Sequence, residues 1–445
     1  MKLLRPLMPH QLRALEFCEE HPNPFLAMAM RTGKTLTAIR YARRKYPGGK
    51  FLVVAPLTVL IPWAKELDNE ALKAQALLVG DKAVLVSEKR PGWYLVGPAA
   101  LKVNSYLLRE DWDMLIVDES TVIRNPAAQI TQYLNHHIVS AKERMCLSGW
   151  PCPESEMDWF EQLRFLHGSF MGCKNYYQWR RKYFVNFGYV WHPRPGTSTA
   201  IKQALQGKVF FLSAKEAGMP NAFVEELRYV KMYKEQKEIY EQVEKDFAAT
   251  YSGKHMSTKW VPVRDLRLHQ IASGEVCWDD KSSSRFDHKS RELIKLVEGE
   301  LCKEQIVVFF RFDDGVDTAY RAFVERGCPV VRVTGSTPYA ERQTAINAFQ
   351  EGRARVILLQ AECGKYGLDL SSSSVAIFYS QGYSFEVWAQ CRQRLAHPSK
   401  KSPNLLIYLV SEDTIETQIL PALKDKKSVG DFYFNKLHEN TLHRS

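Results

Sequence analysis

The stretch that most constrains this chain is Phe25–Ile39, FLAMAMRTGKTLTAI. An apolar run leads into a short polar turn, and helix-forming residues follow the turn. Backbone N–H groups at such a turn and at the helix N-terminus converge on one point, where the helix dipole favours an anion. Gly33 allows close approach to a phosphate, Lys34 can reach the β- and γ-phosphates, and the Thr35 hydroxyl can ligate Mg²⁺. The stretch predicts a nucleotide-binding loop, although Met28 stands where the full pattern has a glycine.

Composition limits the class of protein. At 445 residues the chain is too long for one ordinary core, so we expect at least two domains. No apolar run approaches the ~18 residues of a membrane span, and the N-terminal MKLLRPLMPHQ lacks a signal-peptide core, so we expect a cytoplasmic protein. The nine cysteines form no CxxC pair, which favours reduced thiols over a zinc site. The formal net charge of +11 favours a polyanionic partner.

A second apolar run, Met114–Ser120, ends in two acids. Strands that alternate with helical segments along the chain indicate a parallel sheet, whose ligand site lies at the carboxyl ends of its strands. Asp118 would then lie beside the phosphate loop and hold Mg²⁺, while Glu119 would orient or deprotonate the attacking water. The run Met145–Pro151 breaks at Ser148–Gly149, which could sense the γ-phosphate or form an ordinary strand-end turn.

In order and spacing, these segments resemble a superfamily 2 helicase or translocase of the Swi/Snf-like branch. The matching segments of the first half are LMPHQ (the glutamine motif), MRTGKT (motif I), VVAPLTVLIPWAKE (motif Ia), VDESTVIRNP (motif II) and LSGWPCPESEMDWFEQLRFL (motif III). Those of the second half are QIVVFFRF (motif IV), VILLQAECGKYGLDL (motif V) and EVWAQCRQRLAHPSK (motif VI). The resemblance covers nearly the whole chain and implies an α/β fold of two tandem RecA-like parallel-sheet lobes. Such lobes would close on ATP and Mg²⁺ and move along DNA.

Motif VI departs from the family at one position. The family pattern is Q-x-x-x-R-x-x-R, which Gln390 and Arg394 match, whereas His397 stands at the second arginine. A permanently charged guanidinium stabilises a transferring phosphoryl group, and histidine is often neutral. We therefore take Arg394 as the principal arginine, with Arg392 as a substitute or a solvated helix residue.

The resemblance extends the set of candidate site residues, with Gln11 expected at the adenine edge. The candidate catalytic residues are Lys34, Asp118, Glu119 and Arg394, and the candidate Mg²⁺ ligands are Thr35 and Asp118. The candidate nucleotide-binding residues are Gln11, Arg31, Thr32, Gly33, Lys34, Thr35, Gly367, Asp369 and Gln390.

Three segments are expected from these motifs. Residues 1–168 would form the first lobe, residues 169–222 an aromatic and basic insertion between the lobes, and residues 223–445 the second lobe. Within the insertion, Val185, Phe187, Tyr189 and Trp191 fall at period two, as in a strand with one apolar face. This strand or hairpin could stack on bases at a duplex junction, or could form a small core between the lobes. The candidate nucleic-acid contacts are Arg180, Arg181, Lys182, Tyr189 and Trp191.

Two functions of different classes fit these features. The first is an ATP-driven DNA helicase or translocase, expected to act as a monomer on branched DNA such as replication forks and Holliday junctions, by unwinding or branch migration. The second is a degenerate, non-hydrolysing nucleotide-dependent DNA-binding protein, suggested by Met28, Arg31, Trp150 and His397 at family positions. The chain's small size favours a phage or bacterial enzyme of replication or recombination over a chromatin remodeller or a restriction-type translocase. RNA is a third, weaker candidate substrate.

Overall fold

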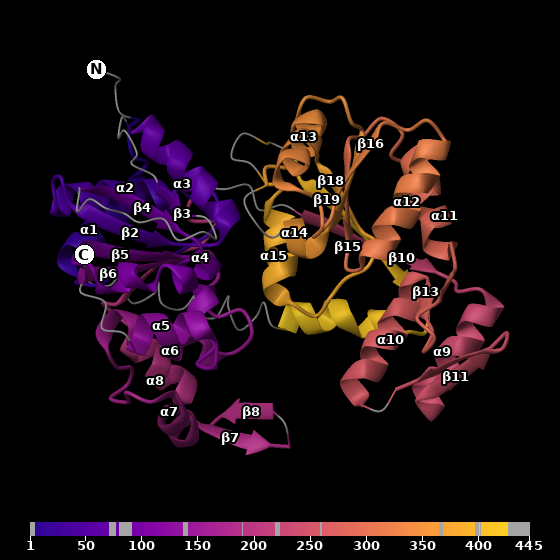
Figure 1. The fold of residues 1–445 in the computed structure, drawn as a ribbon, viewed down its shortest axis with the longest axis horizontal. Coiled ribbons are helices and arrows are strands. Elements are labelled where there is room, and N and C mark those ends of the chain that lie inside the picture. Colours follow the sequence, from indigo (N-terminus) through magenta and orange to yellow (C-terminus); the bar gives the residue numbers. More distant parts are fainter. Residues whose placement is uncertain are drawn as a thin grey trace. The chain divides into compact units, whose positions relative to one another are not determined.

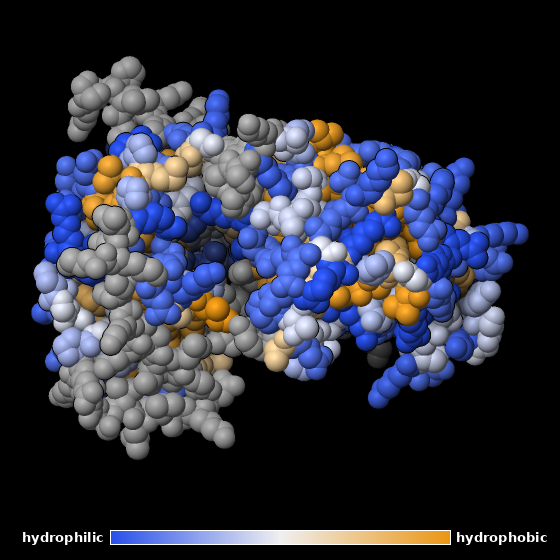
Figure 2. Space-filling view, turned by 90° about the horizontal axis from the view of Figure 1, so that it is seen from above, coloured by the Kyte–Doolittle hydropathy of each residue, from blue (hydrophilic) through white to orange (hydrophobic). Residues whose placement is uncertain are grey.

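The fold divides into two units. The computed structural model describes residues 5–70, 77–79, 91–136, 141–188, 190–218, 223–258, 260–364, 368–396, 400 and 402–425. The described part of the first unit lies within Met1–Met219, and the second unit is Pro220–Asp425. Across these described ranges, no helix is long and apolar enough to cross a bilayer. On the face drawn in Figure 2, hydrophilic residues predominate on the described surface, with apolar residues scattered among them.

A seven-stranded parallel sheet, in the order β3-β4-β2-β5-β6-β1-β9, forms the centre of the first unit (Figure 1). Its strands are β1 (Phe25–Met28), β2 (Lys50–Val54), β3 (Leu77–Val79), β4 (Gly92–Val96), β5 (Trp112–Asp118), β6 (Ala141–Ser148) and β9 (Val209–Leu212). Its α-helices are α1 (Pro9–Glu20), α2 (Lys34–Lys45), α3 (Leu57–Asn69), α4 (Pro98–Val103), α5 (Gln129–His136), α6 (Trp159–His167), α7 (Tyr176–Tyr183) and α8 (Thr197–Leu205). Short 3₁₀ turns are η1 (Ser105–Arg109), η2 (Ser120–Ile123) and η3 (Glu156–Asp158).

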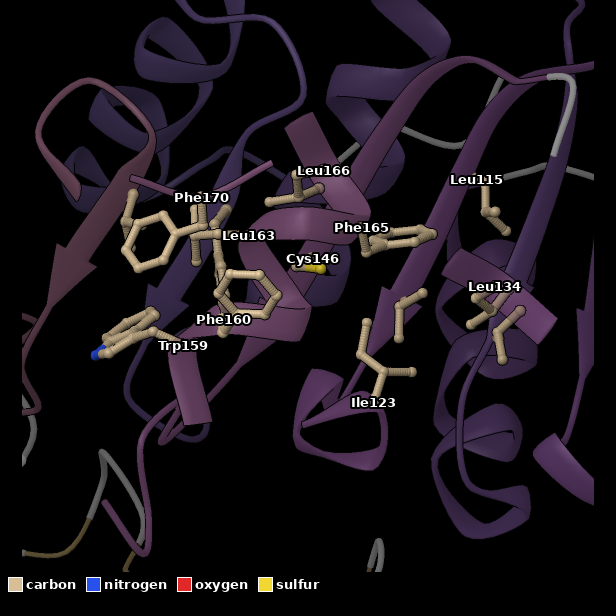
Figure 3. Packing of buried hydrophobic residues seen from close by; sticks show 14 of the residues in the cluster. Leu115, Ile123, Leu134, Cys146, Trp159, Phe160, Leu163, Phe165, Leu166 and Phe170 are labelled. Carbon is tan, nitrogen blue, oxygen red and sulfur yellow. The ribbon is translucent and has the colours of Figure 1, made fainter. Parts of the chain in front are cut away.

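Both faces of the first sheet are covered, as the near-continuous apolar strands require. Side chains on one face, such as Phe25 and Ala27, pack against α6, whose Phe160, Leu163 and Leu166 are seen in Figure 3. The alternate residues Leu26 and Met28 pack in a second cluster with α1, α2 and α3. The sheet is therefore a rigid layer whose strand ends can hold a site.

The segment predicted as an insertion, 169–222, contributes to the first unit in two ways. Its strand β9 pairs in parallel with β1, with Phe25 opposite Val209. Its helix α7 inserts the fully buried Trp179, whose ring lies 5.1 Å from that of Phe160. Beyond α7, the antiparallel hairpin of β7 (Phe184–Phe187) and β8 (Val190–Pro193) projects away from the first sheet (Figure 1).

The second unit contains a six-stranded parallel sheet in the order β10-β19-β18-β15-β17-β16. Its strands are β10 (Phe223–Val230), β15 (Ile306–Phe310), β16 (Val330–Val333), β17 (Val356–Gln360), β18 (Val375–Phe378) and β19 (Asn404–Ser411). Its helices are α9 (Lys234–Asp246), α10 (Val261–Ser273), α11 (His288–Glu298), α12 (Asp313–Glu325), α13 (Tyr339–Gln350), α14 (Ala361–Gly364) and α15 (Phe385–Gln393). Two hairpins, β11 (Ala248–Tyr251) with β12 (Lys254–Ser257) and β13 (Glu275–Cys277) with β14 (Ser283–Arg285), accompany α9 and α10. The predicted α/β class with two parallel-sheet lobes is confirmed.

A buried polar network joins α10 and α11 to the strand ends of the second sheet. Lys289 of α11 is fully buried, and its Nζ donates to Glu416 at 2.6 Å, to Leu409 O at 3.1 Å and to Tyr379 O at 2.9 Å. Ser411 N donates to the same carboxylate at 2.9 Å. Because each ionised group has an opposite charge and hydrogen-bond partners, the fold can hold both without water.

Two histidines beside this network stay neutral in the folded chain. His288 Nε2 lies 3.1 Å from Ser411 Oγ, and burial, with the charge of Lys289, lowers the pKa of His288 to about 3. Burial, with the charges of Arg311 and Lys289, also holds the pKa of His269 well below its usual value. Glu416 lies 3.6 Å from His269 Nε2, but that carboxylate is already engaged by Lys289, which favours the neutral imidazole.

Acid should therefore weaken the second unit through His288. The unfolded chain takes up a proton near pH 6.5, whereas the folded chain resists protonation down to about pH 3, so stability is full above pH 6.5 and is lost as pH falls. Between pH 7 and pH 5 we expect this side chain alone to cost about 2 kcal/mol of unfolding free energy. Urea unfolding of wild type and His288→Gln at both pH values measures the difference. An equal pH dependence in the two proteins would contradict the assignment.

Candidate active site

The turn between β1 and α2 has the backbone shape of a phosphate loop. Gly33 is the N-cap of α2 and has φ of 84°, a conformation that L side chains rarely adopt. A Cβ on Gly33 would lie 2.0 Å from Nε2 of Gln11, so the Gln11 side chain would have to move, and the positive φ would strain any L residue there. Gly33 adds no side chain of its own at the N-terminus of α2, where backbone N–H groups can bind an anion. Thr35 follows in the first turn of α2 and is half-buried.

Lys34 and the turn after β6 lie against the same loop. Lys34 Nζ donates to the carbonyls of Met28, at 2.8 Å, and Ala29, at 3.2 Å. A Cβ on Gly149 would lie 3.7 Å from Lys34 Nζ and 3.1 Å from Met30 Cγ. The parallel pairing of β6 with β1 produces this contact, since both strands end at the same edge of the sheet. Ser148–Gly149 is thus placed where a phosphate on Lys34 would be in reach.

Asp118 ends β5 on the same edge, one strand beyond β6. Its Oδ2 accepts a hydrogen bond from the indole Nε1 of Trp63 at 2.7 Å, and its Oδ1 accepts one from the backbone N of Glu119 at 2.8 Å. Burial raises the pKa of the Asp118 carboxyl, and the charge of Lys34 acts against that rise. The electrostatic interaction links the predicted phosphate and Mg²⁺ residues across the edge of one sheet.

Left-handed backbone occurs at two predicted site residues that are not glycine. Arg31 in the loop has φ of 62°, and Glu119 has φ of 50°. Each such residue costs on the order of 1–3 kcal/mol and persists where the surrounding structure holds it, commonly at functional sites. Both conformations occur directly at the two predicted motifs, in the loop before α2 and after the last residue of β5.

Helix α1 supports the loop through two polar side chains. Gln11 Nε2 donates to Thr32 O at 3.1 Å, and its Oε1 accepts from Met8 N at 2.9 Å. His10 Nε2 lies 2.9 Å from the same Thr32 carbonyl. Thr32 itself is buried and donates from Oγ1 to Ala29 O at 2.7 Å. Gln11 therefore ties α1 to the loop, and its contact with adenine stays a prediction.

The sequence did not indicate a role for His10 or Trp63. Trp63 is fully buried on α3, and His10 precedes Gln11 on α1. The motif VVAPLTVLIPWAKE contains Trp63, but neither its spacing nor its composition indicates an indole donor to Asp118. The only sequence signal for His10 was its place beside a predicted site residue.

The remaining nucleotide-site candidates belong to the second unit. Arg394 caps the C-terminus of α15, and the buried Gln390 donates to Glu386 Oε1 at 3.4 Å. Asp369 Oδ1 accepts from Ser371 N at 3.1 Å. Gly367 and His397 lie outside the described residues.

Arg392 is not a solvated helix residue. It was predicted as a substitute for the missing arginine or as a solvated helix residue. It is instead buried, with Nη1 2.5 Å from Glu225 Oε1 and its guanidinium 4.2 Å from the Trp388 ring. Arg392 therefore joins α15 to β10 through Glu225, which also pairs with Lys424 Nζ at 2.8 Å, and its role as a substitute arginine stays a prediction.

The nucleic-acid candidates separate into two groups. Arg181 and Lys182 are exposed on α7. Arg180 instead places its guanidinium 4.1 Å from the ring of the half-buried Trp191. Tyr189 lies outside the described residues. The single apolar strand face predicted over Val185–Trp191 is wrong, because the chain turns at Gly188 and puts Trp191 on the opposite face from Phe187.

These residues fit a nucleoside triphosphate with Mg²⁺. Gly33 presents a bare backbone at a helix N-terminus, Lys34 supplies a cation, and Asp118 supplies a hard oxygen ligand fixed by Trp63. Thr35 adds a hydroxyl in the first helical turn. In the described parts of the chain, no group of three or more His, Cys, Asp or Glu side chains is placed to hold a metal ion.

Removing the indole donor should weaken metal-dependent binding. In Trp63→Phe, Asp118 loses a hydrogen bond that holds its carboxylate and lowers its pKa, so Mg²⁺-dependent nucleotide affinity should fall about tenfold. The pH below which binding is lost should rise, because the Asp118 carboxyl then stays protonated up to a higher pH. Titration of a fluorescent ATP analogue with Mg²⁺ measures both effects. Trp93→Phe, a similar loss of volume in the same core cluster, is the control, and an equal loss in both variants would contradict the role of Trp63.

Family models match most of the chain. The model described as "SNF2-related domain" matches residues 10–277, and the model described as "Helicase conserved C-terminal domain" matches residues 288–398. Nuclear protein STH1/NPS1 of Saccharomyces cerevisiae is 23% identical over 95% of this chain and 34% of that protein. The ISWI chromatin-remodeling complex ATPase ISW1 of the same yeast is 24% identical over 94% of this chain and 40% of that protein. The chain thus spans between a third and two-fifths of the length of these two relatives.

A viral relative and a solved structure are similar over a larger share of their own length. The "Probable global transactivator" of Orgyia pseudotsugata multicapsid polyhedrosis virus is 23% identical over 98% of this chain and 92% of that protein. A solved structure titled "Sulfolobus solfataricus SWI2/SNF2 ATPase core in complex with dsDNA" has a TM-score of 0.46 and 19% identity, covering 97% of this chain and 93% of that one.

Proposed function

This chain belongs to the SNF2-related domain family, and we propose that it hydrolyses ATP to move along DNA. The observation that supports this most is the meeting of Lys34, Asp118 and Ser148–Gly149 at the carboxyl edge of the first sheet. A cation, a buried carboxylate and a helix N-terminus converge there, as phosphoryl transfer requires.

The first unit supplies most of the chemistry. Lys34 would leave its two backbone carbonyls and contact the β- and γ-phosphates, and Glu119 would orient the attacking water. Thr35 and Asp118 would hold Mg²⁺, which when bound neutralises charge on the phosphate oxygens. Trp63 keeps the Asp118 carboxylate in one orientation by its hydrogen bond.

The second unit would supply Arg394 as a transition-state cation. A guanidinium carries a permanent charge and can stabilise the transferring phosphoryl group when the two units close on the nucleotide. Closure and its release on hydrolysis would shift one unit along the DNA backbone. The net charge of +11 favours phosphate contacts, so DNA affinity should fall steeply with salt.

The alternative of a non-hydrolysing, nucleotide-dependent DNA-binding protein loses part of its basis. Met28, one of the departures that suggested it, is fully buried in a core cluster, and its carbonyl accepts a hydrogen bond from Lys34. Trp150 is half-buried and packs on the other core cluster. Lys34, Asp118 and Glu119 are present, which favours turnover.

Action on branched DNA, as a monomer in the cytoplasm, is part of the proposal. The yeast relatives reported above include a chromatin-remodelling ATPase, and the viral relative is named a transactivator. These relatives therefore do not support the phage origin that the chain's size suggested. Nor do they support a role in replication, recombination or branch migration.

Substrate preference can be tested on a panel of nucleic acids. Phosphate release by wild type would be measured with linear duplex, forked duplex, a four-way junction and an RNA duplex, and movement would be followed by displacement of a triplex-forming strand. We expect DNA to stimulate phosphate release and ATP to be needed for displacement, with the branched substrates giving the largest response. If no DNA stimulates phosphate release and the triplex-forming strand is not displaced, the motor is excluded. The nucleotide-dependent DNA-binding protein would then be the remaining candidate. A larger response to RNA than to DNA would exclude the DNA motor.

A further inference from the structure

One part of the first unit is rich in basic residues and contains no acid, although Arg164 at its start pairs with Glu161 just before it. Residues 162–215 contain nine lysines and arginines and neither Asp nor Glu, whereas the whole chain has 50 acidic residues against 61 basic ones. Lys174, Arg181, Lys182 and Arg194 of this segment are exposed. An exposed surface of positive charge attracts polyanions and can contact the phosphates of a nucleic-acid backbone.

The β7–β8 hairpin within this segment has an inner and an outer face. Its register pairs Phe184 with Pro193 and Asn186 with Trp191 on the face toward α7. Phe184 is buried 5.0 Å from the Trp179 ring, and Trp191 lies under the guanidinium of Arg180. The inner face is therefore anchored to the first unit.

The base of the hairpin is closed by two hydrogen bonds to one backbone carbonyl. Arg194 N donates to Tyr183 O at 2.9 Å, and Thr197 Oγ1 donates to the same carbonyl at 2.8 Å. Behind it, the Trp179 ring lies 5.1 Å from Phe160 and 5.9 Å from Phe170. A ribbon fixed at its base and along one face presents its other face with little conformational freedom to lose on binding.

The outer face ends in an exposed aromatic ring. Val185 and His192 are paired on this face, and Phe187 lies on it at the end of β7. Phe187 is 68% exposed, and its ring is 5.9 Å from that of His192. Within the parts of the chain that the structure describes, nothing buries this ring. An exposed ring, in a segment that also exposes Arg181 and Lys182, has the chemistry that stacks on an unpaired base.

We propose that the outer face of the β7–β8 hairpin, together with Arg181 and Lys182, binds DNA at the point where a duplex meets unpaired bases. The cations contact backbone phosphates, and Phe187 stacks on the first unpaired base. Bases inside an intact duplex offer no free face to a ring, so the aromatic contact selects the junction. Arg180 and Trp191 do not contact DNA and act as positioning residues for the hairpin. This assignment rests on the proposed function, because it specifies the DNA structure on which the motor acts.

The test measures affinity for forked and blunt DNA by fluorescence anisotropy across a range of salt. Phe187→Ala should weaken fork binding about 5- to 100-fold and leave blunt-duplex binding within about twofold, while Phe187→Tyr should restore the fork preference. The double variant Arg181→Ala/Lys182→Ala should weaken binding to both substrates. The slope of log K against log salt concentration should become shallower by the amount expected for the loss of roughly two phosphate contacts. The control Lys303→Ala removes an exposed charge before β15 and should leave the affinity for both substrates unchanged.

The outcomes separate this inference from the function on which it rests. Phe187 is exposed, so thermal unfolding should show both ring variants folded. If wild type prefers forks and Phe187→Ala keeps that preference, the hairpin assignment is wrong and the motor is unaffected. If DNA neither binds wild type nor stimulates its phosphate release, the proposed function itself fails. If Phe187→Ala weakens binding to a forked RNA but not to forked DNA, the partner is not DNA.

Discussion

Lys34→Ala is expected to abolish ATP turnover, with a fall of at least about 10²-fold in DNA-stimulated phosphate release. The substitution removes the cation that would contact the β- and γ-phosphates. It also removes the charge that acts against the burial-raised pKa of Asp118. The residual Mg²⁺-dependent binding should therefore move to higher pH, because the Asp118 carboxyl then stays protonated to a higher pH.

The matched control for this substitution lies on the same helix. Lys45 is exposed in the last turn of α2, away from the loop, so Lys45→Ala should keep wild-type turnover. Loss of the two Lys34 hydrogen bonds should cost about 1–2 kcal/mol of unfolding free energy, which thermal unfolding can bound. Equal phosphate release from Lys34→Ala and wild type would exclude this loop as the ATPase site.

Glu416→Gln is expected to cost the second unit about 3–5 kcal/mol of unfolding free energy. The amide leaves the ammonium of Lys289 buried without a counter-charge, at a position with no exposed surface. Ser411 N also loses a charged acceptor. Urea unfolding, followed by probes placed in the second unit, measures the loss.

An exposed ion pair nearby provides the control for the buried one. Asp413 lies 3.3 Å from Lys237, and its side chain is 78% exposed. Asp413→Asn should therefore change stability by less than about 0.5 kcal/mol, and asparagine tolerates the left-handed backbone of that residue. The double variant Lys289→Met/Glu416→Leu should recover only part of the loss, because the carbonyls of Tyr379 and Leu409 lose their donor. Equal effects of Glu416→Gln and Asp413→Asn would show that the buried pair contributes nothing specific.

The elements that local pattern determines were predicted from the sequence. Apolar runs such as Met114–Val117 indicated buried parallel strands, and Gly33–Thr35 indicated a phosphate loop, because backbone freedom, charge and helix start are all local properties. The family membership was confirmed by the match of residues 10–277. The parallel order of the strands then placed Asp118 on the same edge as Lys34.

The contacts that tertiary packing creates were not predicted. The bond from Trp63 to Asp118 joins α3 to β5, and the pairing of Arg392 with Glu225 joins α15 to β10. The periodicity of the sequence does not indicate such contacts, because each contact depends on where two elements distant in the sequence meet. The predicted strand over Val185–Trp191 failed for a local reason, since the turn at Gly188 exchanges the faces of the residues that follow it.

The central claim is that the carboxyl edge of the first sheet hydrolyses ATP in response to DNA. Glu119→Gln tests it most directly, because the amide should still bind nucleotide but cannot accept a proton from water. Single-turnover phosphate release with saturating ATP and duplex DNA should be fast in wild type and slower by at least about 10²-fold in Glu119→Gln, with ATP affinity little changed. Equal single-turnover rates in the two proteins, or a wild-type rate that DNA does not raise, would contradict the claim.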